Sequence, residues 1–270
     1  MTINPTQLAT RPYRWRSLLL RLVAPLLAAG LMILGWSISI RVWQIKPYLL
    51  PTPTGVCREF LEEGPLLLGA LGLTARAALT GLALSTFSGI AISVIFSQSA
   101  TLRFALFPYA IFLQTVTIVA IAPLLIMWLG YGTQGVVAVA FVLSLFPIIA
   151  NVTAGMLTVP RPLLDLFALQ RASRGQTLCK LQFPFAVNSL MTGIKTSSGL
   201  SVIGAIVGEF FVGYGGKGFG LGYLIRSSAE SYQTASLFAA VILSTLLGVA
   251  VFAVTSVVAE IVLRRWGHHH

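Results

Sequence analysis

Four stretches of the chain contain no Asp, Glu, Lys or Arg, and their length restricts the folds that the chain can adopt. They cover residues 22–40, 77–102, 104–160 and 231–259. A helix needs about 20 apolar residues to cross the hydrocarbon core of a membrane, so each stretch fits one crossing and the third fits two. With 56% hydrophobic and 9% charged residues and a mean hydropathy of +0.88, the chain is expected to be an integral membrane protein.

Turn signals and a fifth apolar run divide the chain into about six predicted membrane helices. Gly130, Gly132 and Gly135 mark a turn within the third stretch, and a further run at 187–212 is interrupted only by Lys195 and Glu209. We therefore expect an all-α polytopic protein with helices at about 22–42, 68–94, 107–129, 136–157, 188–211 and 236–263. Residues 1–20 are interpreted as a cytoplasmic segment, 21–266 as one transmembrane domain and 267–270 as a tag remnant.

The distribution of basic residues predicts the orientation of these helices, because loops rich in Lys and Arg stay in the cytoplasm. With the N-terminus inside, eleven of the 18 Lys and Arg residues fall in inner segments and five in outer segments, while Arg76 and Lys195 lie within predicted helices. Both termini are therefore expected in the cytoplasm. The formal net charge of +11 is attributed to topology and anionic lipid rather than to nucleic acid, since the basic residues lie beside apolar spans.

The longest predicted cytoplasmic loop, residues 158–187, is amphipathic. Pro184 is expected to disrupt the helical pattern where the chain enters the next span, so we predict two short helices joined at about residues 171–175. Their apolar faces need cover from the protein's own helix ends, from lipid headgroups or from a cytosolic partner. The apolar residues at helical spacing are Leu163, Leu164, Phe167, Leu178, Leu181 and Phe185.

The segment DLFALQRASRGQTLCKLQFPFA within this loop resembles the EAA loop of permease subunits of ATP-binding-cassette (ABC) importers. Asp165 takes the acidic place of that loop, and Pro184 takes the place of its proline. Leu166 and Phe167 replace the two usual alanines, and Arg171 replaces the usual glycine. The resemblance implies a coupling helix that sits in a cleft of an ATPase subunit. The implied coupling residues are Asp165, Arg171, Ala172, Ser173, Arg174, Gly175, Leu178, Leu181 and Pro184.

Further segments between about residues 49 and 266 resemble the nitrate, sulfonate, taurine and vitamin-precursor branch of these permeases, and they occur in the order of that branch. They are LLPTPTGVCREF, LFPYAIFLQTVTIVAIAPLLIMWLGYG, LFPIIANVTAGM, GIKTSSGL, and GEFF followed by GLGYLI. Thr117 and Ile118 stand where the branch commonly has a proline and a basic residue. We therefore expect a local kink and a charge of that branch to be absent.

The resemblance implies a type I ABC importer permease fold and an alternating-access mechanism. It also implies the partners, which are a second permease copy in a homodimer, two cytosolic ATP-binding subunits and an external or periplasmic substrate-binding protein. The implied location is the bacterial cytoplasmic (inner) membrane, in contact with lipid.

The chain is not expected to be an enzyme, and ATP and Mg²⁺ are assigned to the partner subunits. It has no GxxxxGK[ST] phosphate-binding loop, and GYGGKGFG at 213–220 departs from that pattern and is interpreted as a flexible outer turn. All three histidines lie in the terminal GHHH, and Cys57 and Cys179 are expected on opposite sides of the membrane. No cofactor, metal site or disulfide is therefore predicted in this chain.

Polar groups on membrane helices are costly unless they are paired or solvated, so they mark candidate positions on a substrate pathway. For each Ser or Thr, the alternative is a hydrogen bond to the backbone of its own helix, beside glycines that allow close packing. Glu209 is either an interfacial acid or an external gate or binding-protein contact. The pathway candidates are Gln114, Thr115, Thr117, Ser197, Ser198, Ser201 and Glu209.

The run at residues 208–243 resembles permeases for thiamine-type pyrimidines or riboflavin more than those for nitrate. We therefore expect a permease for a small organic compound such as a thiamine-type pyrimidine, riboflavin or a sulfonate. The alternatives are a permease for an anion of the nitrate or bicarbonate type and an ATP-independent secondary carrier. A carrier usually has acidic residues inside the membrane, whereas Glu209 and Glu260 both lie near the ends of predicted spans.

Overall fold

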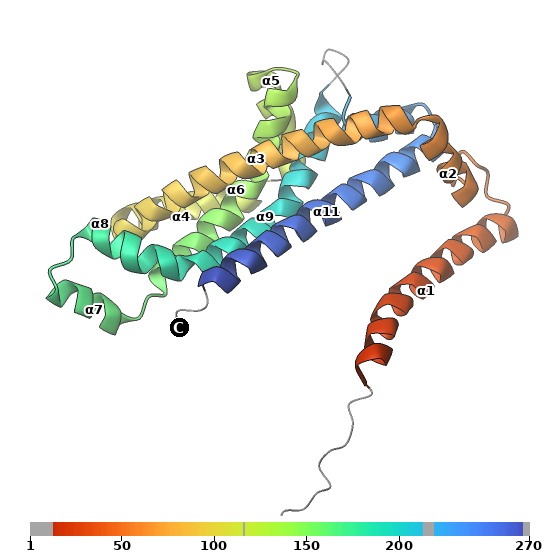
Figure 1. Ribbon diagram of the computed structural model, residues 1–270. Helices are drawn as coiled ribbons and strands as arrows, with labels where there is room; N and C mark the ends of the chain where they lie inside the picture. The colour runs from red at the N-terminus through yellow and green to blue at the C-terminus, as the bar shows by residue number, and fades with distance from the viewer. Residues whose placement is uncertain (1–12, 116, 213–218, 267–270) are drawn as a thin grey trace, which may run out of the picture.

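The computed structural model describes residues 13–115, 117–212 and 219–266, and all the regular elements in these ranges are helical (Figure 1). The all-α fold is therefore confirmed. The predicted tag remnant and most of the GYGGKGFG turn lie outside the described residues. The elements are α1 (Tyr13–Val42), α2 (Pro53–Glu62), α3 (Gly64–Gln98), α4 (Ala100–Thr115), α5 (Ile118–Leu129), α6 (Thr133–Leu157), α7 (Arg161–Leu169), α8 (Arg174–Thr177), the π-helical η1 (Leu178–Gln182), α9 (Phe183–Phe211), α10 (Leu221–Glu230) and α11 (Thr234–Trp266).

Four of the described helices are long and apolar enough to cross a membrane. They are α3, α6, the continuous helix Arg174–Phe211 that joins α8, η1 and α9, and most of α11. Two shorter apolar helical stretches, Gly30–Val42 and Ile118–Leu129, accompany them. Helices near five of the six predicted positions are present, and the fold class predicted from the uncharged stretches is confirmed.

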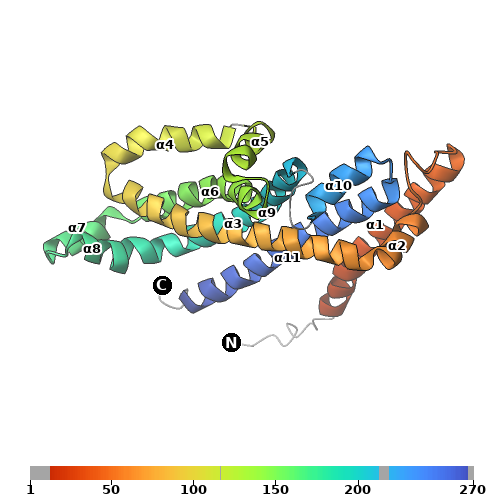
Figure 2. The same cartoon turned by 90° about the horizontal axis from the view of Figure 1, so that it is seen from above.

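The predicted single helix at 107–129 is wrong, because the chain is divided there between α4 and α5. The two helices run in different directions (Figure 2), and Thr117 between them has extended backbone angles, with φ −63° and ψ 114°. All five residues from 115 to 119 are β-branched, TVTIV, and such side chains lose χ1 freedom in a helix. A break at this point therefore costs little helical stability, and the expectation that a local kink is absent at Thr117 and Ile118 is wrong.

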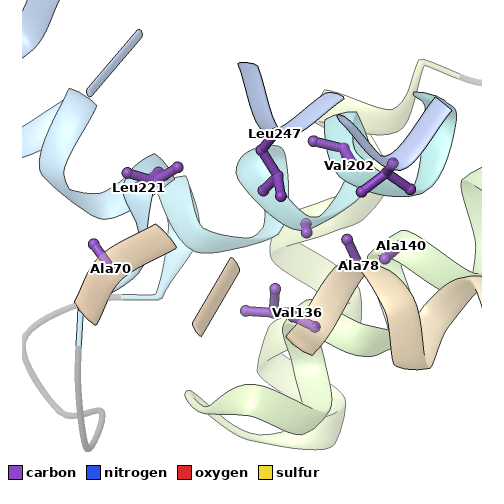
Figure 3. Close-up of a cluster of buried hydrophobic side chains, with 10 residues drawn as sticks. Ala70, Ala78, Val136, Ala140, Val202, Leu221 and Leu247 are labelled. Atoms are coloured by element: carbon purple, nitrogen blue, oxygen red, sulfur yellow. The ribbon is translucent and has the colours of Figure 1, made fainter. Parts of the chain in front are cut away.

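The core of the bundle is formed where α3, α6 and α9 approach one another closely at Ala140. A Cβ atom added to Gly81 of α3 would lie 2.6 Å from the Cβ of Ala140, and one added to Gly204 of α9 would lie 2.7 Å from its Cα. Ala140 of α6 is thus held between two glycines, and the backbones come into contact as is typical of membrane helices. The surrounding buried side chains come from α3, α6, α9, α10 and α11 (Figure 3).

The two ends of the bundle carry different short elements. Figure 2 shows α7 and α8 at one end, and α2 and α10 toward the other. Following the predicted orientation, these are named the inner end and the outer end. Helix α1 stands apart from the bundle along most of its length (Figure 1). It joins the bundle near its C-terminal end, where Trp36 stacks on Phe238 of α11 with ring centroids 5.5 Å apart.

Candidate functional site

The turn between α7 and α8 at the inner end is well defined by hydrogen bonds. The Ala172 N–H donates to the Phe167 carbonyl at 2.9 Å, and the Arg171 N–H donates to the Ala168 carbonyl at 3.0 Å. This pair of bonds closes α7 as a Schellman motif, which requires a left-handed residue after the helix. Arg171 is that residue, with φ 54°. The position where the EAA loop usually has glycine is therefore the position whose backbone favours glycine.

The next helix begins immediately after this turn. The Gln176 N–H donates to Ser173 Oγ at 3.2 Å, and the Ser173 N–H donates to Gln176 Oε1 at 2.8 Å, which together form a capping box. Because the end of α7 and the start of α8 are both capped, the 171–175 linker predicted from the sequence has a fixed geometry.

The expectation that a second short helix ends at Pro184 is wrong. Residues 174–211 form one continuous helix, in which η1 is a π-helical segment just before the proline. In η1 the Phe183 N–H donates to the Leu178 carbonyl five residues earlier. A proline inside an α-helix clashes with the carbonyl four residues before it, and the wider π turn avoids this clash. Pro184 is thus accommodated rather than helix-breaking.

The structure divides the predicted docking residues into two groups. Leu181 is only 6% exposed, and Leu178 packs against the core cluster that includes Ile148 and Met156. Their apolar surface is therefore covered by the protein itself, which corrects the expectation that they present a docking face. Pro184 is half-buried, and Asp165, Arg171, Ser173, Arg174 and Gly175 are exposed, with Ala172 half-buried between them.

The exposed apolar surface of the loop lies on α7. Leu169 is 82% exposed and Leu166 is 48% exposed. Sequence reasoning did not identify Leu169 as a docking residue, although its place one turn after Leu166 was visible as helical spacing. Within 158–187 the chain has four basic residues and one acidic residue. The inner end therefore presents two leucines in a basic setting.

The serine candidates for the substrate pathway are buried between helices. Ser197 Oγ donates to the Ser144 carbonyl at 2.6 Å, Ser198 Oγ donates to the Lys195 carbonyl at 2.7 Å, and Ser201 Oγ donates to the Ser198 carbonyl at 2.9 Å. All three residues are fully buried. Their hydrogen bonds to backbone carbonyls support the packing alternative, since a buried hydroxyl with a partner has no need of solvent or cargo.

The candidates in the region of the α4–α5 break are separate from these serines. Thr115 is exposed and donates through Oγ1 to the Phe112 carbonyl at 2.9 Å. Thr117 is exposed and precedes α5 without a side-chain capping bond. Gln114 belongs to α4, but its side chain lies outside the described residues. Thr115 and Thr117 are therefore exposed, in contrast to the buried serines.

Glu209 lies near the outer end of α9 and is only 6% exposed. Its Oε2 accepts a hydrogen bond from Thr74 Oγ1 at 2.9 Å and another from the Gly222 N–H at 2.8 Å. Thr74 belongs to α3 and Gly222 to α10, so the carboxylate joins three helices. The carboxylate is therefore buried and paired between helices rather than exposed at the helix end.

A cavity of about 750 Å³ opens at the outer end, and sequence reasoning did not predict it. Its walls come from the α1–α2 connection, α2, the start of α3, α10 and the start of α11, and include Tyr48, Glu59, Glu63, Ser228 and Tyr232. This cavity is named the outer pocket. Glu59, Glu62 and Glu63 lie close together in the sequence, and this cluster of acids could have indicated the region.

Residues 68–268 match the protein family described as binding-protein-dependent transport system inner membrane component. The match covers most of the chain, including every helix of the core and the α7–α8 turn. The chain belongs to this family. The permease is thus a multi-pass subunit of an importer for small substrates. The family description names a binding protein, and membership of this ABC importer family implies ATP-binding subunits as further partners.

Several curated relatives are similar to this permease over most of its length. The formylaminopyrimidine transport permease protein ThiX of Halalkalibacterium halodurans is 31% identical over 88% of this chain and 94% of its own. The riboflavin transport system permease protein RibX of Chloroflexus aurantiacus is 28% identical over 87% of each chain. The taurine transport system permease protein TauC of Escherichia coli is 26% identical over 96% of this chain and 92% of its own. All three are transport subunits, as predicted here, rather than enzymes.

A solved structure shares the fold. A chain of the MetNI methionine ABC transporter, in a study of its inward facing conformations, matches with a TM-score of 0.64 over 73% of this chain and 96% of its own. The two sequences are 16% identical. The likeness therefore confirms the predicted type I ABC importer permease fold, and it concerns the arrangement of helices alone.

Proposed function

We propose that this permease imports a small organic compound by alternating access, with ATP hydrolysis in two cytosolic subunits driving the change between its states. The observation that carries the proposal is the exposed α7, whose apolar residues Leu166 and Leu169 lie next to a doubly capped turn. An exposed apolar helix face of this kind fits a groove on a partner. The rigid turn passes a push on α7 into the continuous helix that begins with α8.

The coupling role is assigned residue by residue from the geometry. Leu166 and Leu169 make the apolar contact, while Arg171, Arg174 and Lys180 offer exposed cations to an acidic rim of the partner cleft. Ala172, Ser173 and Gly175 shape the turn. Asp165 is exposed on α7, and Leu178, Leu181 and Pro184 connect the loop to the core.

The proposed assembly contains a second copy of the permease, in contact with membrane lipid. Support comes from α1, whose described apolar residues Leu31, Met32, Ile33 and Leu34 are all exposed although they are consecutive and point in different directions. A helix that is apolar all round is buried in protein or lipid on every side. In the proposed assembly, the orientation predicted from the basic residues has both termini in the cytoplasm. ATP and Mg²⁺ are bound by the partner subunits.

The proposed cargo is a formylaminopyrimidine-like or riboflavin-like compound, or a sulfonate. Support comes from the relatives named for these cargoes, which cover 80% or more of both chains. An inorganic anion is the second candidate, because the nitrate import permease protein NrtB of Synechocystis is 26% identical over 78% of this chain. The absence of a basic residue at Ile118 favours the uncharged pyrimidine and riboflavin candidates over nitrate, since a buried anion needs a counter-charge.

The test is reconstitution of the permease in proteoliposomes with the ATP-binding subunit and the binding protein of its own system. We expect ATP hydrolysis to be stimulated by the loaded binding protein and to accompany uptake of one of the labelled compounds formylaminopyrimidine, riboflavin, taurine or nitrate. Uptake of nitrate alone would select the second candidate. Uptake that proceeds without the ATP-binding subunit would overturn the importer mechanism and support a secondary carrier.

A further inference from the structure

Helix α10 has an N-terminus that is capped by residues from two other helices. Its own N-cap, Gly220, has no side chain to do this. The Leu221 N–H donates to Thr74 Oγ1 at 2.8 Å, the Gly222 N–H donates to Glu209 Oε2 at 2.8 Å, and the Thr74 hydroxyl donates to the same carboxylate oxygen. Two of the N–H groups that a helix start leaves unpaired are thus satisfied by α3 and α9, and the carboxylate complements the helix dipole.

The fit of α10 on this carboxylate leaves no room for a side chain at its start. A Cβ atom on Gly220 would overlap the carboxylate of Glu209, and one on Gly222 would overlap the carbonyl of Ile206. The two glycines of the GLGYLI segment are therefore required by close contact with α9. Further along α10, Arg226 Nη1 donates to the Phe210 carbonyl at 2.8 Å, which is a second attachment to the end of α9.

The attached helix forms part of the outer pocket. Leu224, Ser227 and Ser228 of α10 line it, so the position of α10 sets the shape of one wall. We propose that Glu209 is a positioning residue that fastens α10 to the outer ends of α3 and α9 and thereby shapes the outer pocket. It is not a cargo contact, because one of its carboxylate oxygens accepts two hydrogen bonds and the other lies against Gly220.

The attachment can be measured in the purified permease in lipid nanodiscs, without ATP-binding subunit or cargo. Ser228, which is 5% exposed, is replaced by cysteine as a reporter, and the exposed Cys57 and Cys179 are replaced by serine. The rate of labelling by a bulky polar maleimide then reports how often α10 leaves its place. We expect Glu209→Ala to raise this rate about tenfold, the factor that corresponds to losing one hydrogen bond to a charged group.

Two further variants make the result independent of how well Glu209→Ala folds. Gly220→Ala keeps the carboxylate but displaces it, and it is expected to raise labelling similarly. Glu209→Gln is expected to raise the rate less than Glu209→Ala does, because its amide oxygen can accept the same two hydrogen bonds but carries no charge. The matched control is Gly199→Ala in α9, where an added Cβ meets nothing within 4 Å, and its labelling rate should not change.

Native labelling rates in both Glu209→Ala and Gly220→Ala would overturn the inference, as would equal acceleration by Gly199→Ala. Fast labelling of Glu209→Gln, equal to that of Glu209→Ala, would overturn the hydrogen-bond account. These outcomes do not test the proposed transport function, which can fail while the positioning role of Glu209 stands. Suppose that Glu209→Ala releases α10, but that the native permease never stimulates ATP hydrolysis. The positioning role of Glu209 would then stand, and the importer mechanism would be refuted.

Discussion

Leu169 offers the most direct test of the coupling surface, because its side chain is 82% exposed at the end of α7. Burying a whole leucine side chain is worth about 1.5–3 kcal/mol, and most of that area is available for burial in a partner. Truncation to alanine keeps only the Cβ methyl group. Leu169→Ala should therefore weaken association with the ATP-binding subunit by about 1–2 kcal/mol, which is about 5- to 30-fold in Kd.

The assay is titration of the ATP-binding subunit onto the permease in nanodiscs, followed by ATP hydrolysis at a subunit concentration below saturation. Leu61→Ala is the matched control, since Leu61 is 85% exposed on α2 at the outer end. It has the same chemistry and nearly the same exposure on the opposite side of the proposed membrane. Native affinity in Leu169→Ala, or equal weakening by Leu61→Ala, would refute the assignment of α7 as the docking helix.

The remaining predictions concern the turn, the core and the corrected docking residues. Arg171→Gly should stabilise the α7–α8 turn by about 1 kcal/mol, because Arg171 has φ 54° and glycine adopts that conformation without strain. Slower amide hydrogen exchange at residues 166–176 would show this stabilisation, and faster exchange would contradict it. Gly81→Val should destabilise the bundle by about 1–3 kcal/mol, since its Cβ would lie 2.6 Å from an atom of α6. Thermal unfolding in detergent measures the loss. Gly72→Ala in the same helix, where an added Cβ meets nothing within 4 Å, should be at least as stable as the native protein. Leu181→Asp should abolish monodisperse elution from size exclusion, because it buries a charge in the inner core, whereas Leu169→Asp should elute normally; normal elution of both would show that the cover over Leu181 is not required.

The sequence predicts the membrane helices of this protein better than it predicts the contacts of its candidate sites. The uncharged stretches establish membrane helices without reference to any partner, because backbone groups in hydrocarbon must pair within their own segment. The same local reasoning located α7 from its spacing. It did not place the break at Thr117, where a β-branched run favours a break but does not require one.

The inner loop shows the limit of local patterns. Spacing at Leu178 and Leu181 indicated an apolar face that needs cover, but a pattern on one helix does not say which surface covers it. Tertiary packing supplied α6 as the cover and left Leu166 and Leu169 exposed instead. Pro184 likewise has two outcomes, a break or a widened π turn, and the packing of the continuous helix selected the second.

The sequence by itself determined an all-helical chain with several membrane spans and a basic loop with an amphipathic first half. These properties follow from the composition and spacing of neighbouring residues, which set the solvent that each segment can occupy. Only the tertiary structure decided what Glu209 does, because its partners Thr74 and Gly222 lie 135 and 13 residues away. From the sequence, a carboxylate near a helix end is interpreted as interfacial. Folding brings a hydroxyl and a helix N-terminus to it, so these hydrogen bonds stabilise the protein only once the bundle has assembled.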